Sequence, residues 1–183
     1  GDISAASLDI SGNIDVDGTT NLDILDVDGA ANFAADVTLA DGADLITASA
    51  GLSNVRFGVN AGNSIASGGN YNTVVGDEAG TAITTGDENT FIGYTAGDAT
   101  TTATGNTALG FSALTTNVLG SRSVAIGRAA LQVQNPASAV NMYNVAVGHG
   151  AGESVTTGIQ NTLIGGRAGD ALTTASNNTA VGY

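Results

Sequence analysis

A phrase of nine residues recurs along most of the chain, and it limits the possible folds more than any other feature. It reads NTVVGDEAG at 72–80, NTFIGYTAG at 89–97 and NTLIGGRAG at 161–169. The frame begins at eight positions, mostly 17 residues apart: 54, 72, 89, 106, 123, 144, 161 and 178. A unit this short cannot bury a core alone, so neighbouring repeats must stack on one another.

The pattern within the phrase predicts a short strand followed by a tight corner. The first residue is Asn in every repeat except at Ser123, and the fifth is always Gly. The second residue is always Val or Thr and the fourth is always apolar, which is the two-residue period of a strand. The more polar stretch that follows, such as TAITTGDE at 81–88, is predicted to form a second strand. We therefore expect an all-β solenoid, or β-roll, with coils of about 17 residues.

The third residue of the phrase bears on assembly. It is apolar in seven of the eight repeats, and Arg56 is the exception. A strand that is apolar on both faces is typical of a strand covered on both sides. One face would fill the coil and the other would meet a second subunit. On this interpretation Ala125 and Ala146 belong to the contact between subunits.

The first 50 residues have a different composition from the repeats. They contain ten Asp and no basic residue, and so carry −10 of the net charge of −13. Apolar residues alternate with Asp, as in Ile14–Asp17, which is typical of short amphipathic strands. We therefore divide the chain into an acidic, Gly- and Asp-rich β shaft segment at 1–50 and a β-solenoid repeat array at 51–183. The chain begins without Met and stops inside its eighth repeat, so we expect it to be a segment of a longer protein.

Composition and charge argue against several partners and chemistries. The negative charge repels nucleic acid and anionic membranes, and no apolar run approaches the roughly 20 residues that span a bilayer. There is no Cys, and His149 is the only His, so one chain cannot supply a thiolate or two-His metal site. The run NIDVDG at 13–18 resembles the start of a calcium loop, but Ile24 stands where that loop needs Glu. We expect no cofactor and no enzymatic activity.

The phrases NTALGFSAL at 106–114 and SVAIGRAAL at 123–131 resemble the repeats of phage tail fibres and of the head domains of YadA-like trimeric autotransporter adhesins. The resemblance covers residues 54–183. It implies a β-roll assembled as a parallel homotrimer, and it likens residues 1–50 to a triple-stranded β-helical fibre shaft. The implied function is that of a virion tail-fibre segment outside the cell. Such a segment gives reach and attaches to a host-surface glycan or protein, alongside other tail or fibre proteins.

Three other functions are weighed against this one. A bacterial trimeric surface adhesin would use the same repeats on a bacterial cell surface. A glycan-degrading tailspike depolymerase would need facing carboxylates, for which Asp77 and Glu78 are the local candidates. An ice-binding array would need a regular Thr grid, and the Thr pairs are interrupted at 118–119 and 139–140.

The residue after the Gly corner varies more freely than any other position and is our first candidate for receptor contact. It is aromatic, basic or imidazole in four successive repeats: Tyr94, Phe111, Arg128 and His149. Stacked coils would align these side chains about 4.8 Å apart along one edge.

The one long step in the frame supplies the second candidate. From Ser123 to the next repeat the frame takes 21 residues, and this stretch holds Pro136 and Tyr143. Pro cannot donate to a strand ladder, so it belongs at an edge or in a loop. We expect residues 132–143 to form a protruding loop while the strands on either side stay in register, and we count Pro136 and Tyr143 as candidate receptor contacts.

Overall fold

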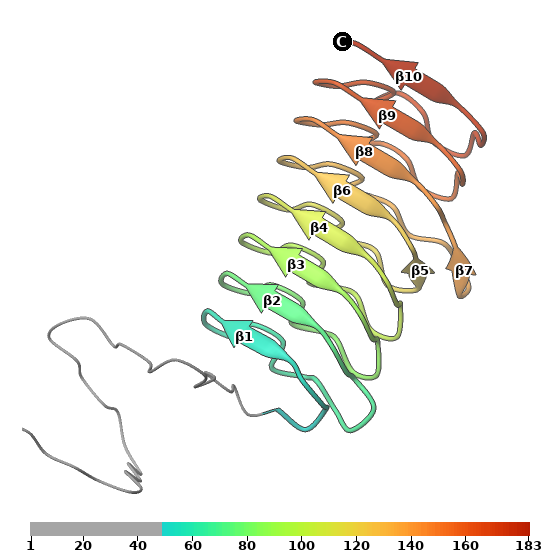
Figure 1. Cartoon of the computed structure of the whole chain (residues 1–183). Helices are drawn as coiled ribbons and strands as arrows, with labels where there is room; N and C mark the ends of the chain where they lie inside the picture. Colours follow the sequence, from blue (N-terminus) through green and yellow to red (C-terminus); the bar gives the residue numbers. More distant parts are fainter. Residues whose placement is uncertain (1–48) are drawn as a thin grey trace, which may run out of the picture. The chain divides into compact units, whose positions relative to one another are not determined.

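The structure is a computed structural model that describes residues 49–183, all of which belong to one compact unit. These residues form a parallel β-solenoid of about seven turns and contain no helix, so none that could cross a membrane (Figure 1). This confirms the all-β class and the coil of about 17 residues. The shaft predicted for residues 1–50 lies almost entirely outside the described residues.

Each repeat contributes one three-residue strand to a single sheet. In stacking order the strands are β1 (Val55–Phe57), β2 (Thr73–Val75), β3 (Thr90–Ile92), β4 (Thr107–Leu109), β6 (Val124–Ile126), β8 (Val145–Val147), β9 (Thr162–Ile164) and β10 (Thr179–Val181). Every neighbouring pair is parallel and aligns the same position of the phrase, so Ala125 lies between Ala108 and Ala146. The frame in the sequence is therefore the register of the sheet.

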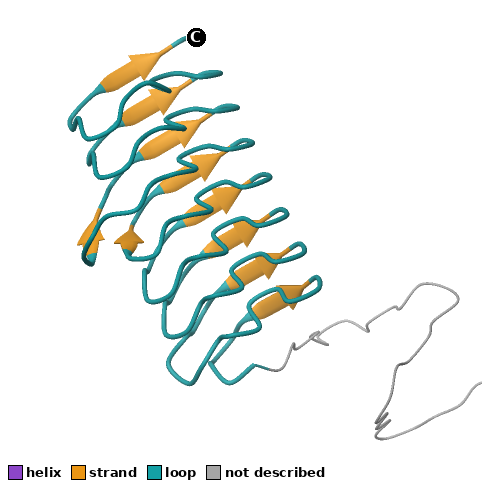
Figure 2. Cartoon of the chain, turned by 180° about the vertical axis from the view of Figure 1, so that it is seen from behind, coloured by secondary structure: helices purple, strands orange, loops and turns teal. Residues whose placement is uncertain are grey.

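The second strand predicted in each coil is wrong for most of the described array. Outside the sheet the coils run through turns and bends, drawn as loops in Figure 2. Neighbouring coils still bond there, for example through the Thr84 N–H to the Thr101 carbonyl at 2.9 Å. Because these bonds are interrupted by turns, they do not form a continuous ladder. The one exception is a two-residue pairing between β5 (Gly120–Ser121) and β7 (Val140–Asn141).

The core of the solenoid is a narrow column of side chains inside the coils. The middle residue of each strand points into it, and Val74, Phe91 and Leu163 are fully buried. Ala125 and Ala146 are buried in the same column, so their assignment to a subunit contact was wrong. The residues before and after them face outward instead, because side chains alternate along a strand.

Buried Asn side chains link successive coils. The Oδ1 of Asn72 accepts from the Asn89 backbone N–H at 3.0 Å, and the Oδ1 of Asn89 accepts from the Asn106 N–H at 3.0 Å. The Nδ2 of Asn89 donates to the carbonyl of Ala103, near the end of the same coil, at 2.9 Å. One amide thus closes its own coil and fixes the position of the next. Leaving such a buried group unpaired would cost about 1–3 kcal/mol.

At the repeat that lacks Asn, a Gln from the long step replaces the missing amide. The Ser123 hydroxyl donates to the Oε1 of Gln134 at 3.2 Å, and the Nδ2 of Asn144 donates to the same oxygen at 2.9 Å. The Nε2 of Gln134 donates to the Oδ1 of Asn117 at 3.1 Å. Gln134 is fully buried, so the long step supplies part of the core.

The loop predicted at 132–143 is therefore correct in one part and wrong in another. Strands β6 and β8 keep their register across it, and residues 137–141 are exposed. In contrast, Gln134, Pro136 and Met142 are buried, and the segment returns to the stack as β7 beside β5 (Figure 1). The extra residues thus enlarge this coil, and their own buried side chains fill the added space. Only the middle of the segment protrudes from the coil.

The glycine at the corner after each strand allows neighbouring coils to approach one another closely. Gly110 has φ of 134°, and a Cβ there would lie 2.7 Å from the carbonyl of Gly127 in the next coil. Gly105 has φ of 71°, but a Cβ there would meet nothing nearer than the Arg122 side chain at 3.7 Å.

We predict that Gly110→Ala lowers the free energy of unfolding by about 3 kcal/mol or more, because the backbone strain and the clash with the next coil add. Gly105→Ala should lower it by about 1 kcal/mol, since only the left-handed backbone is penalised.

Thermal denaturation followed by circular dichroism measures both variants. Equal melting temperatures for the two proteins would contradict the close approach of coils at the corner.

The Gln134 replacement gives a second prediction. Gln134→Ala should lower the free energy of unfolding by about 2–4 kcal/mol, because it leaves buried polar groups on Ser123, Asn144 and Asn117 without their partner. Adding Ser123→Asn to this variant should recover part of the loss by restoring the regular amide. Chemical denaturation measures both effects. The interpretation fails if Gln134→Ala is neutral or if the second substitution destabilises further.

Candidate functional site

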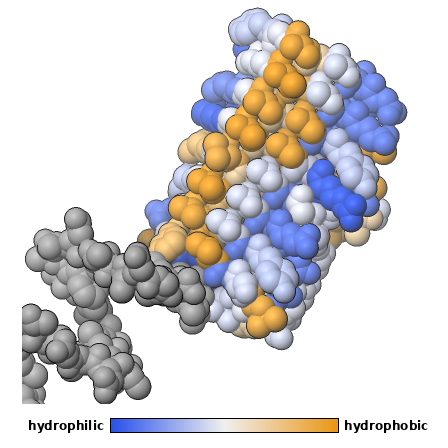
Figure 3. Space-filling model, viewed as in Figure 1, coloured by the Kyte–Doolittle hydropathy of each residue, from blue (hydrophilic) through white to orange (hydrophobic). Residues whose placement is uncertain are grey.

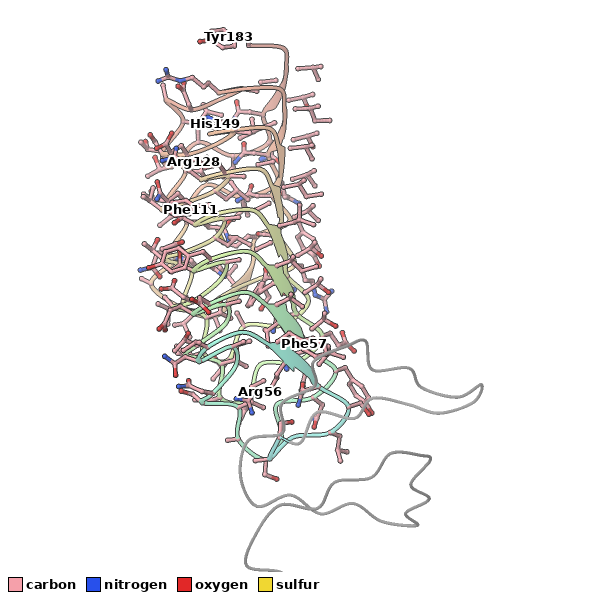
Figure 4. All side chains as sticks on the ribbon, turned by 90° about the vertical axis from the view of Figure 1, so that its left-hand side faces the viewer. Arg56, Phe57, Phe111, Arg128, His149 and Tyr183 are labelled. Carbon is pink, nitrogen blue, oxygen red and sulfur yellow. The ribbon has the colours of Figure 1, made fainter. Side chains whose placement is uncertain are left out.

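Four of the predicted contact residues form a column along one edge of the solenoid, which we call the edge column: Tyr94, Phe111, Arg128 and His149. Each lies one residue beyond the Gly corner, so the register of the sheet places them on successive coils. Figure 4 labels three of them one above another, with Tyr183 further along the same edge. The alignment expected from stacking is therefore present.

The members of the edge column contact one another from coil to coil. The rings of Tyr94 and Phe111 stack with their centroids 5.6 Å apart and an angle of 27° between planes. The guanidinium of Arg128 lies 5.4 Å from the centroid of the Phe111 ring, a cation–π distance. Its Nη1 is 3.3 Å from the Nε2 of His149. The four side chains form one continuous surface.

The charge of this surface differs from that of the rest of the chain. Arg128 and His149 are both exposed, and the single ion pair among the described residues joins Arg167 and Asp170 elsewhere, at 2.9 Å. Among the described residues, Arg128 thus contacts a ring and an imidazole and pairs with no carboxylate. One coil before Tyr94, the same position holds Asp77, which accepts from the Val59 N–H at 3.0 Å. The edge is acidic at that coil and becomes aromatic and then cationic.

The other two predicted contact residues do not join the edge column. Tyr143 precedes strand β8 whereas His149 follows it, so the strand separates them. Pro136 is buried, so its prediction as a receptor contact was wrong: the long step folds it into the coil. Tyr143 is half-exposed and accepts from the Nη1 of Arg122 at 3.2 Å. The sequence analysis missed Arg122, although it stands directly before its phrase, as Tyr143 does one repeat later.

The outward face of the sheet is a second surface of note. It carries Val or Thr at the second position of the phrase and larger apolar residues at the fourth, among them Phe57, Leu109 and Ile164, each more than 40% exposed. Figure 3 shows an apolar stripe that runs along the stack. We call this surface the outer stripe. Soluble monomers seldom expose a continuous apolar surface of this kind.

The acidic pair considered for catalysis is engaged in linking coils. Asp77 accepts from the Val59 N–H, and the Oε1 of Glu78 accepts from the Nδ2 of Asn60 at 2.9 Å. Across residues 49–183 there is no pocket, and no group of three His, Cys, Asp or Glu is placed to hold a metal ion. What the described surface offers to a ligand is an open edge and an apolar face.

Asp98 is the described carboxyl group with a shifted titration. Burial raises its pKa, the backbone N–H groups of Ala99 and Asp98 partly oppose this, and the negative charge of Glu78 adds to the rise. One of its carboxylate oxygens is buried without a hydrogen-bond partner. The folded state therefore holds the proton of Asp98 more tightly than the unfolded state does.

This shift predicts that Asp98→Asn stabilises the protein at neutral pH. A raised pKa in the folded state means that stability falls as pH rises through the unfolded and then the folded pKa, and that no penalty remains below both. Because the group is partly exposed, screening keeps the gain below about 1 kcal/mol, or roughly 1–3 °C in melting temperature. Melting curves at neutral and acidic pH test this: the gain should vanish in acid, and a gain that persists there would exclude ionisation as its cause.

Comparison of the chain with protein-family models, with curated proteins and with solved structures found no match.

Proposed function

We propose that this chain is a structural and adhesive segment of a phage tail fibre, which gives reach and attaches to a host surface. The observation that carries the proposal is the combination of a regular stack with an uninterrupted outer stripe. Each coil adds about 4.8 Å of length and is bonded to the next through the sheet and the Asn side chains. Such an array is suited to mechanical length, and its resemblance to fibre repeats supports a place outside the cell, on the virion.

The outer stripe supports assembly into a parallel homotrimer. Parallel sheets are nearly always covered on both faces, and here the coil interior covers only one. A second copy in the same orientation would bring an identical stripe of the same length. We infer three copies from the resemblance to trimeric fibres and adhesin heads, and the same resemblance assigns residues 1–50 to a triple-stranded shaft.

The edge column lies beyond the Gly corner, on the turn that follows each strand, and so is separate from the outer stripe. Because exposed turns on a rigid scaffold often carry binding residues, we assign host attachment to this edge. A bacterial trimeric surface adhesin would use the same two surfaces in the same way and is the second candidate. The described acids favour a depolymerase less, since Asp77 and Glu78 are engaged in bonds between coils.

The mass of the chain in solution tests the assembly. Light scattering should give about three times the 17.8 kDa of one chain. Ile126→Glu should yield a folded species of lower mass, because it places an unpaired charge in the stripe without entering the coil. Its neighbour Ala125→Glu should unfold the chain, because that residue is buried in the core. Ile126→Thr is the control, since Thr is common on this face, and it should remain a trimer.

Two outcomes would contradict the assembly. One is a wild-type chain that is folded and monomeric at micromolar concentration. The other is an Ile126→Glu variant that keeps the full mass of the wild type.

A further inference from the structure

Arg128 is an exposed cation in an acidic protein, and its neighbours do not neutralise it. Its guanidinium contacts the ring of Phe111 and the imidazole of His149, neither of which is an anion. By contrast, the charge of Arg167 is satisfied by Asp170 at 2.9 Å, and hydrogen bonding to that carboxylate raises the pKa of Arg167. A guanidinium held on an aromatic ring still offers N–H donors to a planar carboxylate. Arg128 is therefore prepared for an anionic group from outside the chain.

The aromatic half of the edge column supplies the other part of a binding surface. Tyr94 and Phe111 are 51% and 47% exposed although they stack on each other. Phe111 is covered by Tyr94 from the coil before it and by Arg128 from the coil after it, so a sugar would contact the exposed outer edges of the two rings. The Tyr hydroxyl can in addition bond a sugar hydroxyl.

Space for such a ligand continues beyond His149. The next coil has Gly166 at the same position, and a Cβ there would meet only the ring of Tyr183, at 3.8 Å. The column position is therefore open on the coil between those of His149 and Tyr183, the two residues that Figure 4 labels. At that coil the column position itself carries no side chain, and the neighbouring Arg167 is bonded to Asp170.

We propose, building on the adhesive function above, that the edge column binds an acidic saccharide of the uronic-acid type. The sugar carboxylate is bound by Arg128, with His149 beside it, and an adjacent sugar ring packs against Tyr94 and Phe111. A neutral glycan would leave the guanidinium without a partner. A nucleic acid would bring a far denser negative charge against a chain whose net charge is −13. One column binds weakly, and several parallel copies on one fibre would add avidity.

Isothermal titration calorimetry with trigalacturonate and with its methyl ester tests this proposal on the complete chain. The two probes share their sugar rings and differ at the carboxyl group, which the methyl ester leaves uncharged. Trigalacturonate should bind at least about tenfold more tightly than the ester, and Arg128→Gln should weaken its binding by about tenfold. Phe111→Ala should lower the affinity for both probes, and its melting temperature is measured to exclude unfolding. Arg167→Gln removes the same charge from an exposed residue two coils further along, and it should change the affinity less than twofold.

Three results would overturn the proposal: no binding of trigalacturonate, equal binding of the ester, or the same loss with Arg167→Gln as with Arg128→Gln. The last would show a response to overall charge rather than to the column. The fibre proposal fails separately. A chain that is trimeric by light scattering but does not bind trigalacturonate retains the fibre assignment and loses the saccharide. A folded monomer that binds trigalacturonate retains the saccharide proposal and loses the fibre assignment.

Discussion

The buried amide at the first position of the phrase is the interaction on which the rest of the structure depends. A coil of about 17 residues has little apolar volume of its own, so burial alone would hold neighbouring coils in approximate contact without fixing their register. The Asn side chain removes this freedom. It bonds the end of its own coil and the backbone N–H of the next, and a slip of one residue would leave both sets of buried groups unpaired. Register, strand length and the position of every surface side chain follow from it.

Fixed register turns one sequence position into one line on the surface. The middle residue of each strand always enters the core, and the residues that flank it always form the outer stripe. The residue after the Gly corner always lies on the edge, where little packing restricts it. This is why Tyr94, Phe111, Arg128 and His149 can vary in chemistry while the coils beneath them remain nearly identical. The fold separates assembly from recognition by assigning them to different positions of one short phrase.

The same regularity explains which features the sequence analysis predicted. The all-β class, the coil length and the alignment of the edge column follow from spacing alone. Which face of each strand points into the coil could not be predicted from spacing, because the residues on both faces are apolar. Ala125 was therefore assigned to the wrong face. A small Ala fits a narrow coil interior as well as a close subunit contact. The second strand was also wrong, since β-rich composition does not distinguish a ladder from a run of bonded turns.

The long step shows a different limit of prediction from sequence. Pro136 indicated a loop, but the segment also had to replace the amide missing at Ser123, and this need is visible only once the Asn side chains are known to bond between coils. Gln134 then becomes a required core residue, and it draws Pro136 inward with it. Arg122 was missed for a similar reason, because its partner Tyr143 is 21 residues away and adjacent only through the register.

Hydrogen exchange measured by NMR tests most directly whether the buried amides hold the stack together. The account predicts that the backbone N–H groups of Asn89, Asn106 and Asn161, which donate to the preceding Asn or its equivalent, exchange only through global unfolding. The N–H groups of the turns between coils, such as that of Thr84, should exchange through smaller local openings. If the Asn N–H groups instead exchange as fast as those of the turns, the amides are not the constraint that sets the register, and the account is wrong at its base.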